Sequence, residues 1–244
     1  MLSSCKHPNL LSFLGFCDEE SEMILVFECA FKETLSDCFR SESSRANLTW
    51  EKRIRICLDI AHALKNVDHN MESKPSMKSP VIESVNVFLD ENSNAAIANF
   101  KVFEINPFPI TSLWQPRSGN FRTWFWDSID VPGIPSGQRL VVDDVYYLGV
   151  ILFEILTGKL ANRSIYMIEN VNEFASIGML KNMVDIVIKE EAQHSLDAFS
   201  EITYQCLTGS PSQHPTIEIV IKSLEKALHI QVSKCLKLKL VIVS

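Results

Sequence analysis

The sequence has no excess of positive charge and no long apolar segment, and each absence excludes a class of protein. Among its 244 residues, 23 are Lys or Arg and 30 are Asp or Glu, so the formal net charge is −7. A nucleic-acid-binding protein needs a basic face, and this acidic balance argues against one. No apolar run approaches the roughly 20 residues of a membrane-spanning helix, and the opening residues, MLSSCKHPN, do not have the pattern of a signal peptide.

The cysteines lack the spacing of metal sites and of disulfide frameworks. There are seven, an odd number, and none stands in a C-x-x-C pair, which argues against both a zinc knuckle and a disulfide-stapled fold. With 46% apolar and 22% charged residues, the composition is that of an ordinary globular protein. These features predict a reduced, intracellular protein with one large domain or two small ones.

Short apolar runs predict four strands. Residues 10–16 and 23–28 flank an acidic turn, which is the pattern of an antiparallel pair. Residues 86–90 and 95–100 flank a polar turn and predict a second pair. Residues 101–139 contain several prolines and no regular period, so this stretch is either functional or mobile.

The remaining segments predict helices. A long helix begins near Thr49 as N-cap, and its apolar residues recur every three or four positions: Ile54, Cys57, Leu58, Ala61, Leu64 and Val67. Residues 144–156 are apolar on nearly all faces, which is typical of a helix inside a core, and Gly158 ends it. Further helices are expected over 33–39, 171–189, 196–207 and 216–230, with a Ser-rich loop over 41–47. Few strands followed by many helices indicate an α+β fold.

The order of these segments resembles that of a protein kinase domain. The resemblance rests on HPNLLSFLGFCDEESEMILVFE, LTWEKRIRICLDIAHALKNVDH, NVFLDENSNAAIANF and DVYYLGVILFEILTGK, and on the closing segment SLDAFSEITYQCLTGSPSQHPTIEIVIKSLEKALHIQ. The amino-acid sequence of these segments is most similar to that of plant receptor-like Ser/Thr kinases, in particular the FERONIA-like, malectin-receptor branch. It implies a partial kinase-like domain over residues 1–231, with a tail over 232–244. Within it, residues 1–30 would be a remnant of the small, β-rich N-lobe with the hinge, and residues 31–231 the helical C-lobe.

Several parts that hold ATP in this family have no counterpart in the sequence. A kinase covers the phosphates with a Gly-rich loop, and a Lys paired with a Glu of helix C holds them. This chain has eight glycines, none in a G-x-G pattern, and residue 1 aligns near the end of helix C. The resemblance places Glu28 and Cys29 at the hinge, where the family contacts the nucleotide.

The catalytic loop is altered at the positions that do chemistry. The family pattern H-R-D-x-x-x-x-N uses its Asp to accept the substrate proton and its Asn to hold Mg²⁺. Asn86 matches the Asn, and Val81 then stands at the Asp position, where it cannot orient a hydroxyl group. The Lys two places further on is Glu83, which reverses a charge that would steady the transferred phosphate.

The metal-binding D-F-G motif is altered as well. Thirteen residues after Asn86, the sequence reads Asn99-Phe100-Lys101. A neutral Asn99 lacks the charge that draws Mg²⁺ between two phosphates, whereas Phe100 keeps its packing role. Asn86 and Asn99 are either a residual metal or nucleotide pair or ordinary polar residues.

Structural positions of the family are better kept. Asp144 matches the Asp that holds the catalytic-loop backbone. The family's Pro-Glu at the end of the activation segment is Pro132-Gly133, and the Arg that pairs with this Glu is His214. Losing both partners of a buried ion pair leaves no isolated charge, whereas losing one costs about 3–5 kcal/mol. Packing residues are thus kept while chemical residues are lost.

This pattern favours a catalytically inactive kinase homologue that binds and modulates partners in phosphorylation signalling. One alternative is an ATP-dependent Ser/Thr kinase with atypical residues, and another is a non-functional gene fragment. ATP and Mg²⁺ are implied by the family alone, and no intact catalytic residue or metal site is expected. The expected partners are a receptor-like kinase or its substrate, with no nucleic acid. The expected place is the cytoplasm, including the cytoplasmic face of the plasma membrane through a partner.

Overall fold

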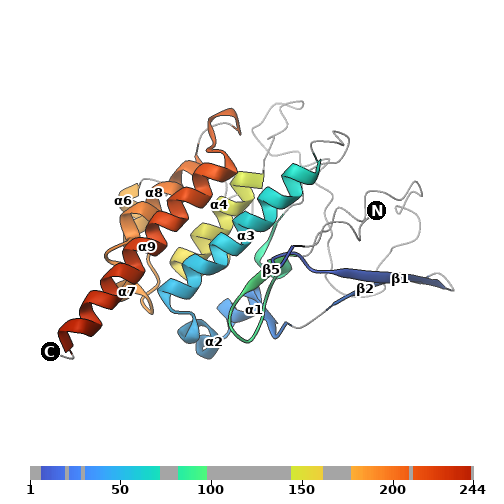
Figure 1. Ribbon diagram of the computed structural model, residues 1–244, viewed down its shortest axis with the longest axis horizontal. Coiled ribbons are helices and arrows are strands. Elements are labelled where there is room, and N and C mark those ends of the chain that lie inside the picture. Colours follow the sequence, from blue (N-terminus) through green and yellow to red (C-terminus); the bar gives the residue numbers. More distant parts are fainter. Residues whose placement is uncertain are drawn as a thin grey trace, which may run out of the picture.

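In the computed structural model, a body of packed helices carries two small antiparallel sheets on one side (Figure 1). The structure describes residues 7–19, 22–28, 31–71, 82–97, 144–161, 177–208 and 211–242. Its elements in chain order are β1 (Phe13–Glu19), β2 (Glu22–Phe27), β3 (Glu33–Thr34), α1 (Leu35–Arg40), α2 (Glu42–Asn47), α3 (Trp50–Met71), a 3₁₀ turn (Ser84–Asn86), β4 (Val87–Leu89), β5 (Ala95–Ile97), α4 (Asp144–Thr157), α6 (Ile177–Asn182), α7 (Lys189–Ala192), α8 (Leu196–Leu207), a second 3₁₀ turn (Pro211–Gln213) and α9 (Ile217–Ile242).

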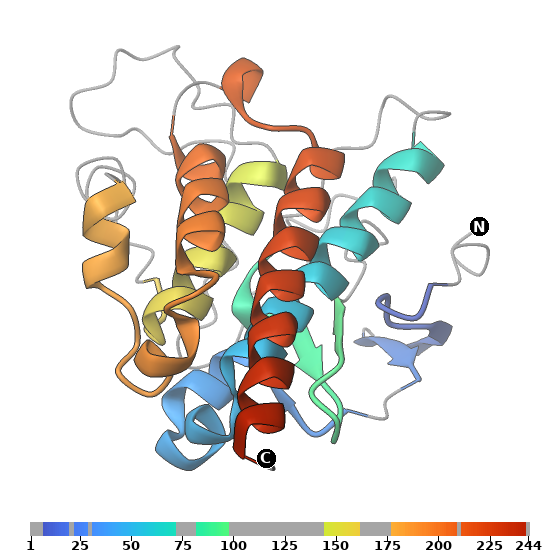
Figure 2. The same ribbon diagram turned by 60° about the vertical axis from the view of Figure 1, so that its left-hand side comes forward.

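The helix α3 lies at the centre of the body because its apolar stripe faces other helices. It packs against α9, α4 and β5, while α8 packs against α4 and α9 (Figure 2). The stripe predicted from the sequence is buried, with Ile54, Cys57 and Leu64 fully inaccessible to solvent. Thr49 caps the helix as expected, since its Oγ1 accepts the N–H of Lys52 at 3.4 Å.

A network of side-chain hydrogen bonds runs through the core from the first residue of α3. The indole N–H of Trp50 donates to Ser195 Oγ at 2.7 Å, and Ser195 Oγ donates to Gln231 Oε1 at 3.2 Å. The Trp50 ring also meets Phe199 edge to face, with ring centroids 4.7 Å apart. A buried indole N–H needs a hydrogen-bond acceptor. The network from Trp50 through Ser195 to Gln231 therefore fixes α3, α8 and α9 relative to one another.

A buried ion pair joins α3 to the turn after α6. Arg53 Nη2 lies 2.7 Å from Asp185 Oδ2, and the two residues are 0% and 5% exposed. Arg53 also donates to the carbonyl oxygens of Leu48 and Ile155, and the N–H of Asp185 donates to Leu156 O at 2.9 Å. The guanidinium group is therefore hydrogen-bonded on three sides, which is the condition under which a buried charge is tolerated.

The stop predicted at Gly158 is confirmed by its backbone. Gly158 adopts a φ of +65° directly after α4, a conformation that residues with a Cβ rarely take. A Cβ at this position would also overlap the Asp185 carboxylate. The glycine thus ends the helix and leaves room for the ion pair.

Both predicted antiparallel pairs form, in two separate sheets. β1 pairs with β2, although the strands run over 13–19 and 22–27 rather than 10–16 and 23–28. β4 lies between β3 and β5 in the second sheet, with Phe88 opposite Ala96 and Thr34. A parallel bridge between Leu10 and Ile97 joins the chain before β1 to the second sheet.

Four sequence predictions need correction. The helix expected over 33–39 begins at Leu35, because Glu33–Thr34 forms strand β3 and Thr34 caps α1. The loop expected over 41–47 contains the helix α2, because Ser41 Oγ caps it by accepting the N–H of Ser44 at 3.3 Å. The single helix expected over 171–189 is broken between α6 and α7, where Asp185 turns inward to meet Arg53. The last helix continues to Ile242, so the expected tail is helical as far as that residue.

Candidate functional site

The candidate site begins at the short turn that precedes β4. Ile82 is buried and anchors the segment, and a 3₁₀ turn over Ser84–Asn86 follows. The N–H of Asn86 donates to Glu83 O at 2.8 Å, so these two predicted site residues are held together by the backbone. Both side chains are half-buried. The turn leads directly into β4, as the resemblance to a kinase catalytic loop implies.

The hairpin between β4 and β5 is held by side-chain and backbone hydrogen bonds. Asp90 Oδ1 accepts the N–H groups of Asn92 and Asn94, both at 2.8 Å, and Ser93 takes a φ of +66°. At the start of β5, the N–H of Ala95 donates to Asp59 Oδ2 on α3 at 2.9 Å. Burial raises the pKa of Asp59, while the hydrogen bond from Ala95 favours its charged form.

The segment before β1 holds β5 from its other side. Asn9 Nδ2 donates to Ala95 O, and the N–H of Ile97 donates to Asn9 O, both at 2.9 Å. The N–H of Leu11 donates in turn to Ile97 O at 2.9 Å. Nearby, burial lowers the pKa of His7. The strand that leads to residue 99 is therefore fixed by α3 on one side and by residues 9–11 on the other.

A buried carboxylate joins this turn to the end of α4. Glu154 is 4% exposed, and its Oε1 accepts the N–H of Ala161 at 2.7 Å. Burial raises the pKa of Glu154 from 4.5 to about 7, although the hydrogen bond from Ala161 and the Ser84 hydroxyl favour the charged form. The residue was missed at the sequence level. A single acid within the otherwise apolar run ILFEIL was the signal that could have found it.

The charge of the candidate site is negative. Residues 82–97 contain Glu83, Asp90 and Glu91 and no Lys, Arg or His. Among the residues that the structure describes, no group of three or more His, Cys, Asp or Glu side chains is placed to hold a metal ion. This segment thus offers no cation to the phosphates of a nucleotide.

The other predicted site residues lie apart or outside the described residues. Glu28 is exposed beyond the end of β2, and its N–H donates to Ser12 O at 2.8 Å. Asp144 is the first residue of α4 and is buried, at 8% exposure. The positions that lie outside the described residues are Cys29, Val81, Asn99, Phe100 and the segment 101–139 with Pro132-Gly133.

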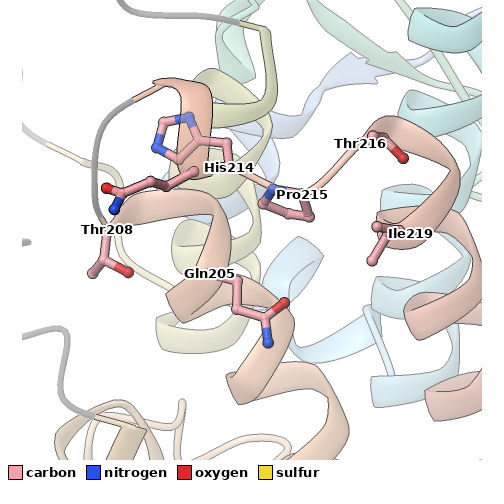
Figure 3. A pocket seen from close by; sticks show the side chains of 7 residues that line it. Gln205, Thr208, His214, Pro215, Thr216 and Ile219 are labelled. Carbon is pink, nitrogen blue, oxygen red and sulfur yellow. The ribbon is translucent and has the colours of Figure 1, made fainter.

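A separate pocket opens between the end of α8 and the start of α9 (Figure 3). Its volume is about 380 Å³, and no residue of 82–97 lines it; the lining residues are Gln205, Thr208, Gln213, His214, Pro215, Thr216 and Ile219. The His214 ring stacks on Tyr146 of α4, with centroids 6.3 Å apart and planes at 25°. His214 thus makes a ring contact at the position where the family resemblance places an ion-pairing Arg.

Comparison with known proteins identifies relatives over most of the chain. The family model "Protein tyrosine and serine/threonine kinase" matches residues 1–224. The chain is 30% identical over 238 residues to receptor-like protein kinase HERK 1 of Arabidopsis thaliana, covering 95% of the chain and 28% of that protein. It is 26% identical over 234 residues to LRR receptor-like serine/threonine-protein kinase FEI 2 of the same plant, covering 92% of the chain and 38% of that protein.

A solved structure has the same fold. It is the pseudokinase domain of BIR2, an immune regulator of the RLK/Pelle family, with a TM-score of 0.68 and 26% identity. The match covers 94% of this chain and 68% of that one. Within the part of this chain that the structure describes, none of the helices combines the length and the hydropathy needed to cross a membrane.

Proposed function

The chain belongs to the protein tyrosine and serine/threonine kinase family and has the fold of a plant receptor-like kinase domain. For this member of the family we propose a function without catalysis. We propose that it is an inactive kinase homologue that binds and modulates partners in phosphorylation signalling. The observation that carries the proposal is the segment from Val81 to Asn99, which has Val81, Glu83 and Asn99 where the family has a catalytic Asp, a Lys and a metal-binding Asp.

Each of the changes at Val81, Glu83 and Asn99 removes a separate contribution to phosphoryl transfer. Val81 cannot accept the proton of a substrate hydroxyl group. Glu83, held next to Asn86 by the backbone, adds a negative charge where the developing charge on the phosphate needs a positive one. Asn99 is neutral where Mg²⁺ requires a carboxylate. Because catalysis in this family is mainly positioning and charge stabilisation, the combined loss removes the reaction.

Apart from the metal-ligand position Asn86, the residues that are kept are those that pack the fold. Asn86 remains on its turn, Asp144 remains buried at the start of α4, and the core around Trp50 and Arg53 is hydrogen-bonded. A binding module needs a folded surface but no catalytic residues. The BIR2 domain, described as the pseudokinase domain of an immune regulator, offers an analogous case.

The proposed organisation follows the kinase frame. Residues 1–30 form the small-lobe remnant and hinge, residues 31–231 the helical lobe, and residues 232–244 an added end. The chain spans 28% of the length of HERK 1, so the partners of this chain are proposed separately from those of the longer relative. We propose that they are a receptor-like kinase or its substrate, met in the cytoplasm or at the cytoplasmic face of the plasma membrane.

A phosphotransfer assay tests the proposed function. The purified chain is incubated with labelled ATP, Mg²⁺ or Mn²⁺ and a generic protein substrate, and label in the substrate and in the chain is counted. We expect no incorporation above the rate without the chain. The double variant Val81→Asp, Asn99→Asp is expected to stay inactive too, because residues 82–97 still provide no cation.

The variant Asn86→Ala serves as the matched control, since it removes the one metal-ligand position that is kept. Incorporation by the chain that disappears in Asn86→Ala would contradict the proposal and establish an unusual kinase. Incorporation that is equal in both proteins would come from a contaminating kinase, and its removal by further purification would leave the proposal standing.

A further inference from the structure

The carboxyl group of Glu154 lies where three parts of the chain meet. It comes from the end of α4, its Oε1 accepts the N–H of Ala161 at 2.7 Å, and the hydroxyl of Ser84 in the turn before β4 also hydrogen-bonds to it. Glu154 and Ser84 are 4% and 6% exposed, so both are shielded from water. The turn of the candidate site is therefore joined to a core helix through an ionisable group.

The enclosure of Glu154 suits a protonated carboxyl group better than a carboxylate. In the described part of the chain, Glu154 Oε2 is buried and has no hydrogen-bond partner. Both oxygens of a carboxylate are acceptors, whereas a protonated carboxyl group carries its proton on one oxygen and needs fewer donors. A buried carboxylate with an unsatisfied oxygen is costly. The ionised form is therefore favoured by an arrangement in which water reaches Oε2.

The α4 side of this enclosure is firmly held. The N–H of Gly158 donates to Glu154 O at 2.8 Å, and the N–H of Asp185 donates to Leu156 O at 2.9 Å. Asp185 is paired with the buried Arg53, so a movement of the end of α4 would disturb this ion pair as well. Opening on this side would thus break several core contacts at once.

The turn before β4 is the weaker side of the enclosure. It is a 3₁₀ turn of three residues, Ser84–Asn86, closed by the bond from the N–H of Asn86 to Glu83 O at 2.8 Å. Val85 in its middle is 43% exposed. Short segments with exposed side chains and few backbone bonds open at a lower free energy than core helices. The turn is therefore the part that moves when Glu154 ionises.

The charged side chains on the helices packed against α4 are paired or exposed. Arg53 of α3 donates to Ile155 O of α4, but its charge is paired with Asp185. Other charged groups of α3 and α8 have other partners or face solvent; they are Glu51 with Arg55, Asp59 with Ala95, Lys65 with Glu218, Asp197 with Lys181, and the exposed Glu201. Nearer to Glu154 in the chain, Lys159 precedes Ala161, and Glu83 precedes the turn.

Glu154 is itself the group that titrates near neutral pH. Burial raises its pKa from 4.5 to about 7, against the hydrogen bonds from Ala161 and Ser84, and the charges of Glu83 and Lys159 are not among the causes. Between these two pH values the enclosed carboxyl group keeps a proton that a solvated one has lost. Opening of the turn then releases this proton, so opening becomes more favourable as the pH rises towards 7 and is constant above it.

From the enclosed carboxyl group, its oxygen Oε2 and the short turn that covers it, we propose that Glu154 acts as a pH-dependent latch on the turn before β4. With its proton, the carboxyl group stays enclosed and the turn stays closed. Without the proton, the turn opens and water reaches the carboxylate. The turn carries Val85 and Asn86 and follows Glu83, so the surface that the candidate site presents changes with pH. The inference does not depend on the proposed lack of catalysis.

Amide hydrogen exchange of the full chain, measured by mass spectrometry, tests the latch. Exchange rates of peptides that cover residues 84–89 are measured from pH 5 to pH 8 in the unchanged chain and in Glu154→Gln, which cannot ionise. Dividing the first rate by the second at the same pH removes the intrinsic pH dependence of exchange. We expect this ratio to rise at least about tenfold between pH 5 and pH 7 and then to level off. Low concentrations of urea should change it little, because local opening exposes little surface.

Two further variants locate the effect. Ser84→Ala removes a hydrogen bond that favours the ionised carboxylate, so the pKa of Glu154 rises further. Its exchange rate relative to the unchanged chain is expected to be level below pH 7 and to increase above it. Glu201→Gln, an exposed acid on α8, is the matched control and is expected to exchange like the unchanged chain at every pH. A thermal melt verifies that each variant is folded, and Ser84→Ala alone provides the test if Glu154→Gln is not.

Two outcomes would overturn the inference. The first is a ratio for residues 84–89 that stays constant from pH 5 to pH 8. The second is a ratio that rises equally for peptides of α3 and increases steeply with urea in both regions, because exchange would then occur through global unfolding. Neither outcome affects the proposed lack of catalysis, which the phosphotransfer assay tests separately.

Discussion

Replacing Asp185 by alanine is expected to lower the free energy of unfolding by about 3–5 kcal/mol. The substitution leaves the Arg53 guanidinium, which is fully buried, without the carboxylate 2.7 Å away. It also removes the acceptor for the N–H of Val187, which Asp185 Oδ1 meets at 3.1 Å. Urea denaturation of the chain and the variant, followed by circular dichroism, measures the difference.

An exposed ion pair of almost the same length provides the matched control. Lys181 Nζ lies 2.6 Å from Asp197 Oδ1, but the Asp197 side chain is 82% exposed. Asp197→Ala is therefore expected to cost about 0–1 kcal/mol. An Asp185→Ala cost no larger than this would contradict the account. If Asp185→Ala does not fold, Asp185→Asn is measured in its place, and adding Arg53→Met to it is expected to recover part of the loss.

Replacing Glu154 by glutamine is expected to change how stability depends on pH. The pKa of Glu154 is about 7 in the folded chain, against 4.5 for an ordinary Glu, so burial penalises the charged form. Below pH 4.5, Glu154 is protonated in both the folded and the unfolded state, so its burial does not lower the free energy of unfolding. The cost grows as the pH rises towards 7 and then stays constant, at roughly 3 kcal/mol by about 1.4 kcal/mol per unit of pKa shift.

The prediction concerns the difference between Glu154→Gln and the unchanged chain. Glutamine keeps an acceptor for the N–H of Ala161 and cannot ionise, so the variant should gain stability relative to the chain between pH 5 and pH 8. Groups such as Asp59, whose pKa burial also raises, are present in both proteins and cancel. Denaturation series at several pH values measure the difference, with Glu201→Gln on the exposed surface of α8 as control. The prediction would be contradicted if the stability difference between Glu154→Gln and the unchanged chain depended on pH as little as the difference for Glu201→Gln.

The fold follows from local patterns where the pattern is strong. The stripe on α3, the apolar run of α4 and the stop at Gly158 each predict their element, because burial and glycine geometry act over a few residues. The break between α6 and α7 was not predictable in this way. It depends on Asp185 meeting Arg53, a partner 132 positions away, and no local period reports such a contact.

The candidate site was predictable in part. The resemblance to a kinase catalytic loop pointed to Glu83 and Asn86, and the structure places them on one turn before β4. The link from Glu154 to Ala161 and Ser84 was not predicted, since the link depends on how the end of α4 meets that turn in three dimensions. The exposure of Leu14, Phe16 and Val26 was likewise not predictable from the sequence, because alternation predicts a strand but not what covers it.

The residues that stabilise the helical body are separate from the altered positions of the candidate site. The contacts that hold the body together involve Trp50, Arg53 and Asp185, and none of these residues lies in the loop from 81 to 97. The proposed loss of catalysis through Val81, Glu83 and Asn99 therefore does not involve these stabilising contacts.

The most direct test of the central claim is a thermal melt of the full chain with and without millimolar Mg·ATP. We expect one cooperative transition whose midpoint is the same in both conditions. A nucleotide present at about 100 times its dissociation constant would add about 2.7 kcal/mol of stability, which corresponds to a shift of several degrees for a chain of this size. A shift of that size that requires Mg²⁺ and disappears in Asn86→Ala would contradict the claim, as would the absence of any cooperative transition.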